Sequence, residues 1–168
     1  MNATGQSGRT QHGGLVMLGQ GSGPRLIFPG LAGFYASWAP IADTLVRIVV
    51  GIMFLMHVSG KFKVGAAAVG ANIMAKNGLE PGLVFAYAAM FLETVGGICI
   101  IIGLFTRFFA AALAIEMGLA LLFVHLAKGY AAGAGGYEYV LLIGIVMFAI
   151  AIRGGGPYSV DAKIGKEL

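Results

Sequence analysis

Ionisable side chains that stand in or beside long apolar stretches are the residues of this chain whose types and spacing could support chemistry. An inner set lies within the stretches and consists of Asp43, Arg47, Glu93 and Glu116. An outer set lies toward the ends of the stretches and consists of His57, Lys61, His125 and Glu138. A charge at membrane depth costs roughly 2.5–3.5 kcal/mol on insertion scales, so such residues face the protein interior and pair.

The inner set predicts a buried charge cluster. Asp43 and Arg47 are one helical turn apart on the same face, and Glu93 and Glu116 lie near the middle of their stretches. The long guanidinium of Arg47 is expected to bridge to Glu93 or Glu116. One arginine cannot neutralise three carboxylates, so we expect at least one carboxyl to be protonated or hydrogen-bonded within a polar cavity. Buried ion pairs of this kind can fix the register of helices without taking part in any chemistry. A structural role and a functional role for the inner set therefore both stay open.

The outer set predicts a second site. His57 and Lys61 are one turn apart, and alternating helix direction is expected to bring them to the depth of His125 and Glu138. Two histidines and a carboxylate can bind a metal ion, but their spacing has no local metal signature, and we predict no metal. The same side chains suit proton handling or a quinone headgroup, whose carbonyl oxygens accept hydrogen bonds. Bound quinone is therefore the candidate cofactor.

The composition shows which elements must position these residues. Hydrophobic residues make up 58% of the 168 residues, charged residues 11%, and the mean hydropathy is +0.88. Soluble domains are about half apolar and about a quarter charged, so the composition indicates a membrane protein. The net charge of +4 comes without a basic run, so we expect no nucleic-acid partner. The lone Cys99 excludes an intramolecular disulfide and a CxxC relay.

Four apolar stretches have about the length of a membrane-spanning helix. They cover residues 40–60, 82–104, 107–127 and 137–153. Hydrocarbon offers the backbone no hydrogen bonds, so these stretches are helices. The fold class predicted is an all-α integral membrane four-helix transmembrane bundle. The lipid bilayer is its first partner, and the helix faces are expected to contact other membrane subunits.

The connections and the small residues predict how the helices of this bundle are arranged. The short link at Thr106-Arg107 predicts an antiparallel hairpin, and residues 64–79 suggest a short helix on the outer membrane surface. Glycines inside the stretches are expected to permit close helix approach, namely Gly51, Gly96, Gly97 and Gly103.

The chain is expected to divide into three parts. Residues 1–36 form a Gly-rich N-terminal arm, residues 37–156 the membrane domain, and residues 157–168 a short polar tail. The arm lacks the features of a signal peptide, and we expect the bundle surface or a partner subunit to hold it.

Lysine and arginine counts predict the orientation. The side that carries both termini has six, namely Arg9, Arg25, Arg107, Arg153, Lys163 and Lys166; the other has four, namely Lys61, Lys63, Lys76 and Lys128. This asymmetry favours the inner (cytoplasmic) membrane with both termini in the cytoplasm.

The ordered series of residues across positions 41–161 resembles the DoxX family of small four-helix membrane proteins. The matching pieces are Arg47, Gly51, Gly60 and Lys61; Glu93 with Gly96-Gly97; Gly103-Leu104 and Thr106-Arg107; His125; Gly135-Gly136 before Glu138; and the ending Gly154-Gly155-Gly156-Pro157 with Ser159-Val160-Asp161.

The resemblance implies a membrane bundle with redox associations, because the family takes its name from a subunit of a thiosulfate:quinone oxidoreductase. The function expected first is an accessory, non-catalytic membrane subunit of a quinone-linked or electron-transfer complex. One alternative is a membrane subunit of a quinone oxidoreductase that contributes a quinone site. A second is a small-solute or proton pathway through Glu93 and Glu116.

Overall fold

The computed structural model describes residues 26–167, and these residues form helices without any strand. Three helical segments are long and apolar enough to cross a membrane, namely Pro29–Val64, Gly82–Ile102 and Thr106–Lys128. The all-α membrane fold class is therefore confirmed. Most of the predicted N-terminal arm lies outside the described residues.

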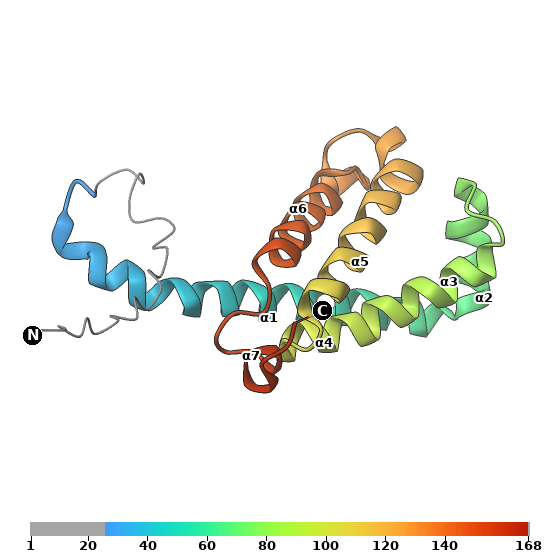
Figure 1. The fold of residues 1–168 in the computed structure, drawn as a ribbon. Coiled ribbons are helices and arrows are strands. Elements are labelled where there is room, and N and C mark those ends of the chain that lie inside the picture. The colour runs from blue at the N-terminus through green and yellow to red at the C-terminus, as the bar shows by residue number, and fades with distance from the viewer. Residues whose placement is uncertain (1–25, 168) are drawn as a thin grey trace, which may run out of the picture.

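The helical elements follow one another with short connections (Figure 1). The α-helices are α1 (Ala32–Val64), α2 (Ala66–Val69), α3 (Gly82–Phe91), α4 (Gly97–Ile102), α5 (Thr106–Leu119), α6 (Glu138–Arg153) and α7 (Val160–Ile164). The π-helical segments are η2 (Gly70–Met74), η4 (Leu92–Gly96) and η5 (Ala120–His125), and the 3-10 segments are η1 (Pro29–Leu31), η3 (Ala75–Asn77), η6 (Leu126–Lys128) and η7 (Ala132–Ala134).

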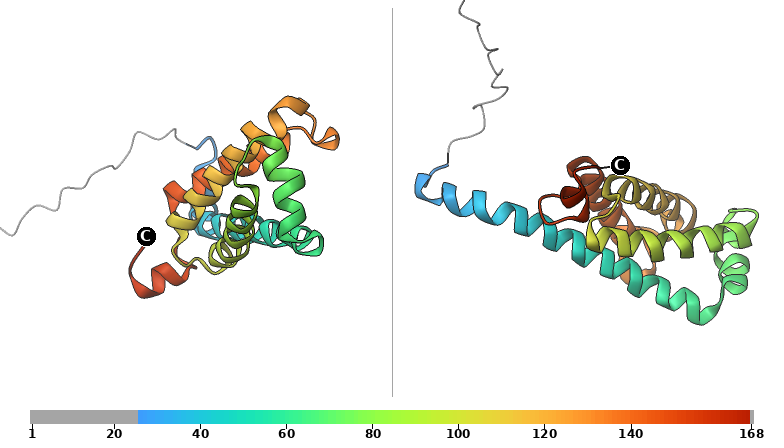
Figure 2. Two further views of the ribbon diagram at one scale, coloured as in Figure 1. Left: turned by 90° about the vertical axis from the view of Figure 1, so that its right-hand side faces the viewer. Right: turned by 60° about the horizontal axis from the view of Figure 1, so that its bottom comes forward.

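Helix α1 is longer than the first apolar stretch predicted. Its 33 residues begin at Ala32 and include Pro40, and a rise of 1.5 Å per residue makes it about 50 Å long. The hydroxyl of Thr44 donates to the Pro40 carbonyl at 2.8 Å. The N-terminal part of α1 extends beyond the other helices, as two views show (Figures 1 and 2).

The rest of α1 packs closely against α4 because glycines face each other. A Cβ atom on Gly51 would lie 2.6 Å from Cγ1 of Ile101 and 2.8 Å from the Gly97 carbonyl oxygen. A Cβ atom on Gly97 would lie 3.2 Å from the Gly51 carbonyl oxygen. These distances leave no room for a side chain, so the predicted role of these glycines in close helix approach is confirmed.

Helices α5 and α6 form an antiparallel pair that builds the main core. Leu113 and Met147 are fully buried there, together with Ile100 of α4. Helix α6 has 16 residues, or about 24 Å, which is shorter than the ~30 Å hydrocarbon core. The fourth predicted stretch is thus a helix packed on α5, but it does not reach spanning length.

The link between α4 and α5 is as short as predicted, but the helices that it joins pack against each other only near the turn. Near the turn Gly96 faces Phe109 and Leu113, where a Cβ atom would lie 3.3 and 3.2 Å from their side chains. Farther along, the α5–α6 pair diverges from α3 (Figure 1). The predicted antiparallel hairpin therefore holds only close to its turn.

Residues 64–79 are helical, as predicted, and pack on α3 rather than standing free. Val69 and Met74 form a small core with Ala86 and Ala89 of α3. A Cβ atom on Gly82 would lie 2.4 Å from the Gly70 carbonyl oxygen. This contact holds η2 against the beginning of α3.

The C-terminal tail stabilises the turn between α4 and α5, residues 103–105, which we call the α4–α5 corner. Asp161 is fully buried and accepts hydrogen bonds from the Phe105 amide (2.8 Å), the Thr106 amide (2.9 Å) and the Thr106 hydroxyl (2.7 Å). Its own amide donates to the Gly103 carbonyl at 2.9 Å. A carboxylate at a helix N-terminus satisfies free amides and complements the helix dipole. The tail is thus a structural element and not only a polar ending.

Arg47 joins α1 to the same corner. Its Nη1 donates to the carbonyls of Ile100 (2.5 Å) and Ile101 (2.7 Å), and its Nη2 donates to the Tyr158 carbonyl (2.9 Å). Arg47 is only 2% exposed. The last carbonyls of a helix have no partner within it, so this guanidinium completes the C-terminus of α4.

Replacing Arg47 should weaken the whole corner. Arg47→Leu leaves three carbonyls without their donor, and we expect a loss of about 3 kcal/mol in the free energy of unfolding, the scale for losing a buried charged partner. Arg153→Leu is the control, since its pair with Asp43 is exposed and should contribute less than ~1 kcal/mol. Unfolding in mixed micelles by a denaturing detergent measures both. Equal losses would contradict the role assigned to Arg47.

Candidate functional site

A buried ion pair joins α1 to the middle of the α3–α4 segment. Nζ of Lys61 lies 2.9 Å from Oε1 of Glu93. Glu93 is fully buried, and the Lys61 side chain is 13% exposed. Lys61 stands near the end of α1, and its long stem carries the ammonium group to the carboxylate. The pair therefore neutralises a charge that would otherwise be costly in an apolar interior.

Glu93 lies in a π-helical segment, η4 (Leu92–Gly96), that interrupts the α3–α4 helix. Short π-helical segments inside α-helices occur frequently at functional sites. A second π-helical segment, η5 (Ala120–His125), ends at His125. Two residues of the predicted site are thus placed by local departures from α-helical geometry.

His57 approaches the same carboxylate from the surface. Its Nε2 lies 3.8 Å from Oε1 of Glu93, which is too long for a hydrogen bond but short enough for an ion pair when the ring is protonated. The His57 side chain is 61% exposed, although it sits on a membrane-spanning helix. The cluster therefore has a buried part, Lys61 and Glu93, and one edge open to the surroundings.

Glu116 of α5 is the other carboxyl of the predicted inner set, and its side chain is partly buried. Oε2 of Glu116 and Oε2 of Glu93 are both buried without a hydrogen-bond partner in the part of the chain that the structure describes. Among the described residues, the ion pair with Lys61 is made by Glu93 and not by Glu116.

The inner set of residues is arranged differently from the prediction. The expected bridge from Arg47 to Glu93 or Glu116 is wrong, because Arg47 donates to backbone carbonyls at the end of α4 instead. Asp43 does not pair with Arg47 either, because its carboxylate binds Arg153 at the molecular surface. The guanidinium of Arg47 binds the end of α4, and Lys61 of the predicted outer set pairs with Glu93 instead.

The outer set is divided as well. Nδ1 of His125 lies 2.7 Å from the Gly135 carbonyl oxygen, and the Glu138 carboxylate accepts from the Ala132 amide at 3.1 Å. Both residues thus order the loop between α5 and α6. Among the described residues, no hydrogen bond or ion pair joins Glu138 to His57 or Lys61, and its place in this group stays a prediction.

Metal binding is not supported by the geometry. Within residues 26–167, no three His, Cys, Asp or Glu side chains come together in a way that could hold a metal ion. Cys99 is buried in α4 as a free thiol. The charged groups of the cluster itself can form hydrogen bonds and ion pairs.

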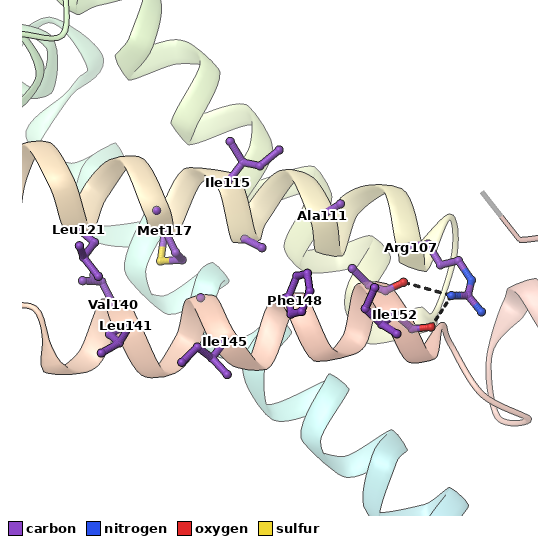
Figure 3. Close-up of a pocket in the computed structure, with 14 residues that line it drawn as sticks. Arg107, Ala111, Ile115, Met117, Leu121, Val140, Leu141, Ile145, Phe148 and Ile152 are labelled. Carbon is purple, nitrogen blue, oxygen red and sulfur yellow. Dashed lines mark hydrogen bonds between the residues drawn. The ribbon is translucent and has the colours of Figure 1, made fainter.

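A groove of about 680 Å³ runs along α5 and α6 (Figure 3). Apolar side chains line most of it, among them Ile115, Leu121 and Phe148. Arg107 closes one end, where its Nη1 donates to the Ile152 carbonyl at 2.5 Å and its Nε pairs with Glu167 at 2.6 Å. Neither His57 nor Lys61 lines the groove, so it lies away from the residues predicted for a quinone headgroup.

Comparison with known proteins identifies the family to which this chain belongs. The family model described as DoxX matches residues 42–126, a segment that contains Arg47, Lys61, Glu93 and Glu116. The chain belongs to the DoxX family. An uncharacterized protein of Haemophilus influenzae is 32% identical over 140 residues, which cover 77% of this DoxX chain and 96% of that relative. No solved structure matches the chain.

Double variants should show whether the partner of Glu93 is Lys61, as in the structure, or Arg47, as predicted from the sequence. Lys61→Met leaves a buried carboxylate unpaired, and we expect a loss of about 3 kcal/mol in the free energy of unfolding. Adding Glu93→Gln should restore part of this loss, because the unpaired charge is gone. The same Glu93→Gln change added to Arg47→Leu should restore nothing. Recovery with Arg47 but not with Lys61, in detergent titrations, would contradict the pairing.

Proposed function

We propose that this DoxX protein is an accessory membrane subunit of a quinone-linked or electron-transfer complex, and that it carries out no turnover alone. The observation that supports this role is the N-terminal part of α1, which extends past the body of the molecule with an apolar surface. The link of the DoxX family to quinone oxidoreductase-type membrane subunits supports the class of complex. The basic residues on the side of the two termini favour the inner membrane with cytoplasmic termini.

The extension can be measured along α1. The helix passes the end of α4 at Arg47, where the guanidinium binds the α4 carbonyls. Trp38 and Phe34 are nine and thirteen residues earlier, or about 14 and 20 Å beyond that level. Both side chains are more than half exposed. This part of α1 therefore lies outside the packed body.

The side chains on this extension form an aromatic surface. Phe34 packs on Tyr35 with ring centroids 5.6 Å apart and on Trp38 at 5.9 Å. Large rigid aromatic side chains dominate the binding energy of protein interfaces. Aromatic residues also lie at membrane interfaces, but the distance past α4 favours contact with another subunit. We therefore assign this surface to docking.

The docking role predicts which variants lose their partner. Phe34→Ala with Trp38→Ala should reduce the amount of co-purifying membrane protein at least tenfold, because hot-spot truncations cost about 2 kcal/mol or more. Phe91→Ala on α3 is the matched control, since Phe91 is 63% exposed on a different helix. Mass spectrometry after purification in gentle detergent measures the yield of partner chains. Equal yields from both variants would contradict the docking surface.

A second role is supported by the exposed ring of His57 beside the buried Lys61–Glu93 pair. Exposed imidazole is unfavourable in lipid, and a quinone carbonyl oxygen that accepts from His57 would remove this cost. The ion pair behind the ring would then hold the cluster in place. On this account the subunit contributes a quinone headgroup site to its complex.

Quinone binding should depend on the charge cluster and not on the groove. His57→Ala should weaken the binding of decylubiquinone to the protein in nanodiscs about tenfold, the scale of one hydrogen bond. Ala111→Leu narrows the α5–α6 groove and serves as the control, with unchanged affinity. If Ala111→Leu weakens binding and His57→Ala does not, the quinone lies in the groove and this role is wrong.

A further inference from the structure

We infer that the groove between α5 and α6 binds one anionic phospholipid, with an acyl chain along the groove and the phosphate group at Arg107. The inference goes beyond the docking and quinone roles, and it depends on neither of them. It assigns a ligand to an apolar groove whose lining includes neither the aromatic residues of the docking surface nor His57.

Small residues leave room in the groove, and large apolar side chains border it. The small residues are Ala111, Ala114, Gly118, Gly144 and Ala151. Ile145, Phe148 and Ile152 are 60–63% exposed, so they are open to the surroundings rather than packed within the chain. The volume of about 680 Å³ is typical of small-molecule sites, which occupy ~300–1,000 Å³. The groove is therefore large enough for a hydrocarbon chain.

Gly118 indicates that this room serves something other than packing within the chain. A Cβ atom on Gly118 would meet no atom of the described residues within 4 Å, whereas one on Gly51 or Gly97 would come within 3.2 Å of the opposite helix. Glycine in a helix interior destabilises the helix relative to most other residues. At position 118 no close helix contact within the described chain offsets this cost. We therefore assign the missing side chain to the ligand in the groove.

The length of the groove matches an acyl chain that begins at the headgroup level of one leaflet. Its α5 side runs from Arg107 to Leu121, fourteen positions or about 21 Å along the helix, and these residues lie near opposite ends of the groove (Figure 3). One leaflet contributes half of the ~30 Å hydrocarbon core, or about 15 Å. The groove can therefore cover an acyl chain through the whole depth of its leaflet.

Arg107 provides the charge that distinguishes a phospholipid from an uncharged apolar ligand. It is the second residue of the spanning segment Thr106–Lys128, which places it at headgroup level. Its Nη1 donates to the carbonyls of Ala151 (3.2 Å) and Ile152 (2.5 Å), and its Nε donates to Glu167 (2.6 Å). These contacts fix the guanidinium at the end of the groove. Its Nη2 makes no hydrogen bond to any described residue, so two N–H groups are left for a phosphate oxygen.

The surroundings of Arg107 are basic overall. The basic residues at this end of α5 and α6 and in the tail are Arg107, Arg153, Lys163 and Lys166, and the exposed acidic ones are Asp43 and Glu167. Basic residues beside a membrane attract anionic headgroups. A zwitterionic headgroup carries its own positive charge and gains less from this surface, so the site should prefer an anionic phospholipid. Glu167 contacts Arg107 and is the carboxylate that competes with the phosphate.

Binding of two matched lipids to the protein in detergent tests the charge at the end of the groove. Native mass spectrometry should show one phosphatidylglycerol bound about tenfold more tightly than phosphatidylcholine with the same acyl chains, the scale of one hydrogen bond to a charged group. Arg107→Gln should remove this preference. Because Arg107 also holds the end of α6, Glu167→Gln is a second variant, and it should strengthen the preference by removing the competing carboxylate. Equal affinity of the wild-type protein for both lipids, or an unchanged preference in both variants, would overturn the proposal.

Filling the groove tests where the acyl chain lies. Gly118→Leu should weaken phosphatidylglycerol binding at least about tenfold, because its side chain takes up part of the groove. Gly60→Leu is the matched control and should bind like the wild-type protein. Gly60 is also an exposed helical glycine with no described atom within 4 Å of its Cβ position, and it does not line the groove. Both variants replace glycine by a better helix former, so both should fold.

Two results of the Gly118→Leu experiment would assign the groove to another occupant and overturn the proposal. The first is wild-type lipid binding with a changed oligomeric state in light scattering, which would make the groove an interface between copies of this chain. The second is wild-type lipid binding with loss of decylubiquinone binding, which would make it a quinone site.

Discussion

A charge inside a membrane protein must find its partner within the protein, and this constraint fixes how α1 sits in the molecule. Arg47 binds the carbonyls that end α4, and Lys61 binds Glu93 in η4. The two residues are fourteen positions apart, or about 21 Å along the helix. Because both charges have partners, a sliding or rotation of α1 against the α3–α4 segment would leave at least one of them without a partner in an apolar environment. The glycines at positions 51 and 97 allow the close approach that both contacts need.

The sequence predicts the elements better than their partners. Apolar stretches, short links and glycines are local signals, and they identify the helices, the corner at Thr106 and the close contact of α1 with α4. The partner of Arg47 is a backbone terminus, which no side-chain type reveals. Asp161 accepts a hydrogen bond from Thr106, which is 55 positions earlier in the chain. The π-helical segment that contains Glu93 has no amino-acid composition that would distinguish it from the α-helix around it. The partners of Arg47 and Glu93 were therefore predicted wrongly because they depend on backbone geometry and long-range contacts. Residue types and their spacing in the sequence do not give this information.

The two ends of α1 serve different purposes in this account. The N-terminal part carries an exposed aromatic surface past the packed body, where another subunit can bind. The C-terminal part carries Lys61, which pairs with the buried Glu93, and His57, whose ring lies 3.8 Å from the same carboxylate. One helix thus connects the proposed docking surface to a buried polar cluster. A membrane subunit built this way can contribute an attachment point and a polar site to a larger complex.

The central claim is that Lys61, and not Arg47, neutralises Glu93. Solid-state NMR of the protein in bilayers measures it directly, through the dipolar coupling between the labelled side-chain nitrogen of lysine or arginine and the carboxyl carbon of Glu93. We predict a strong coupling from Lys61 Nζ, as expected for a nitrogen 2.9 Å from a carboxylate oxygen, and none from the Arg47 guanidinium. A coupling from Arg47, with none from Lys61, would contradict it.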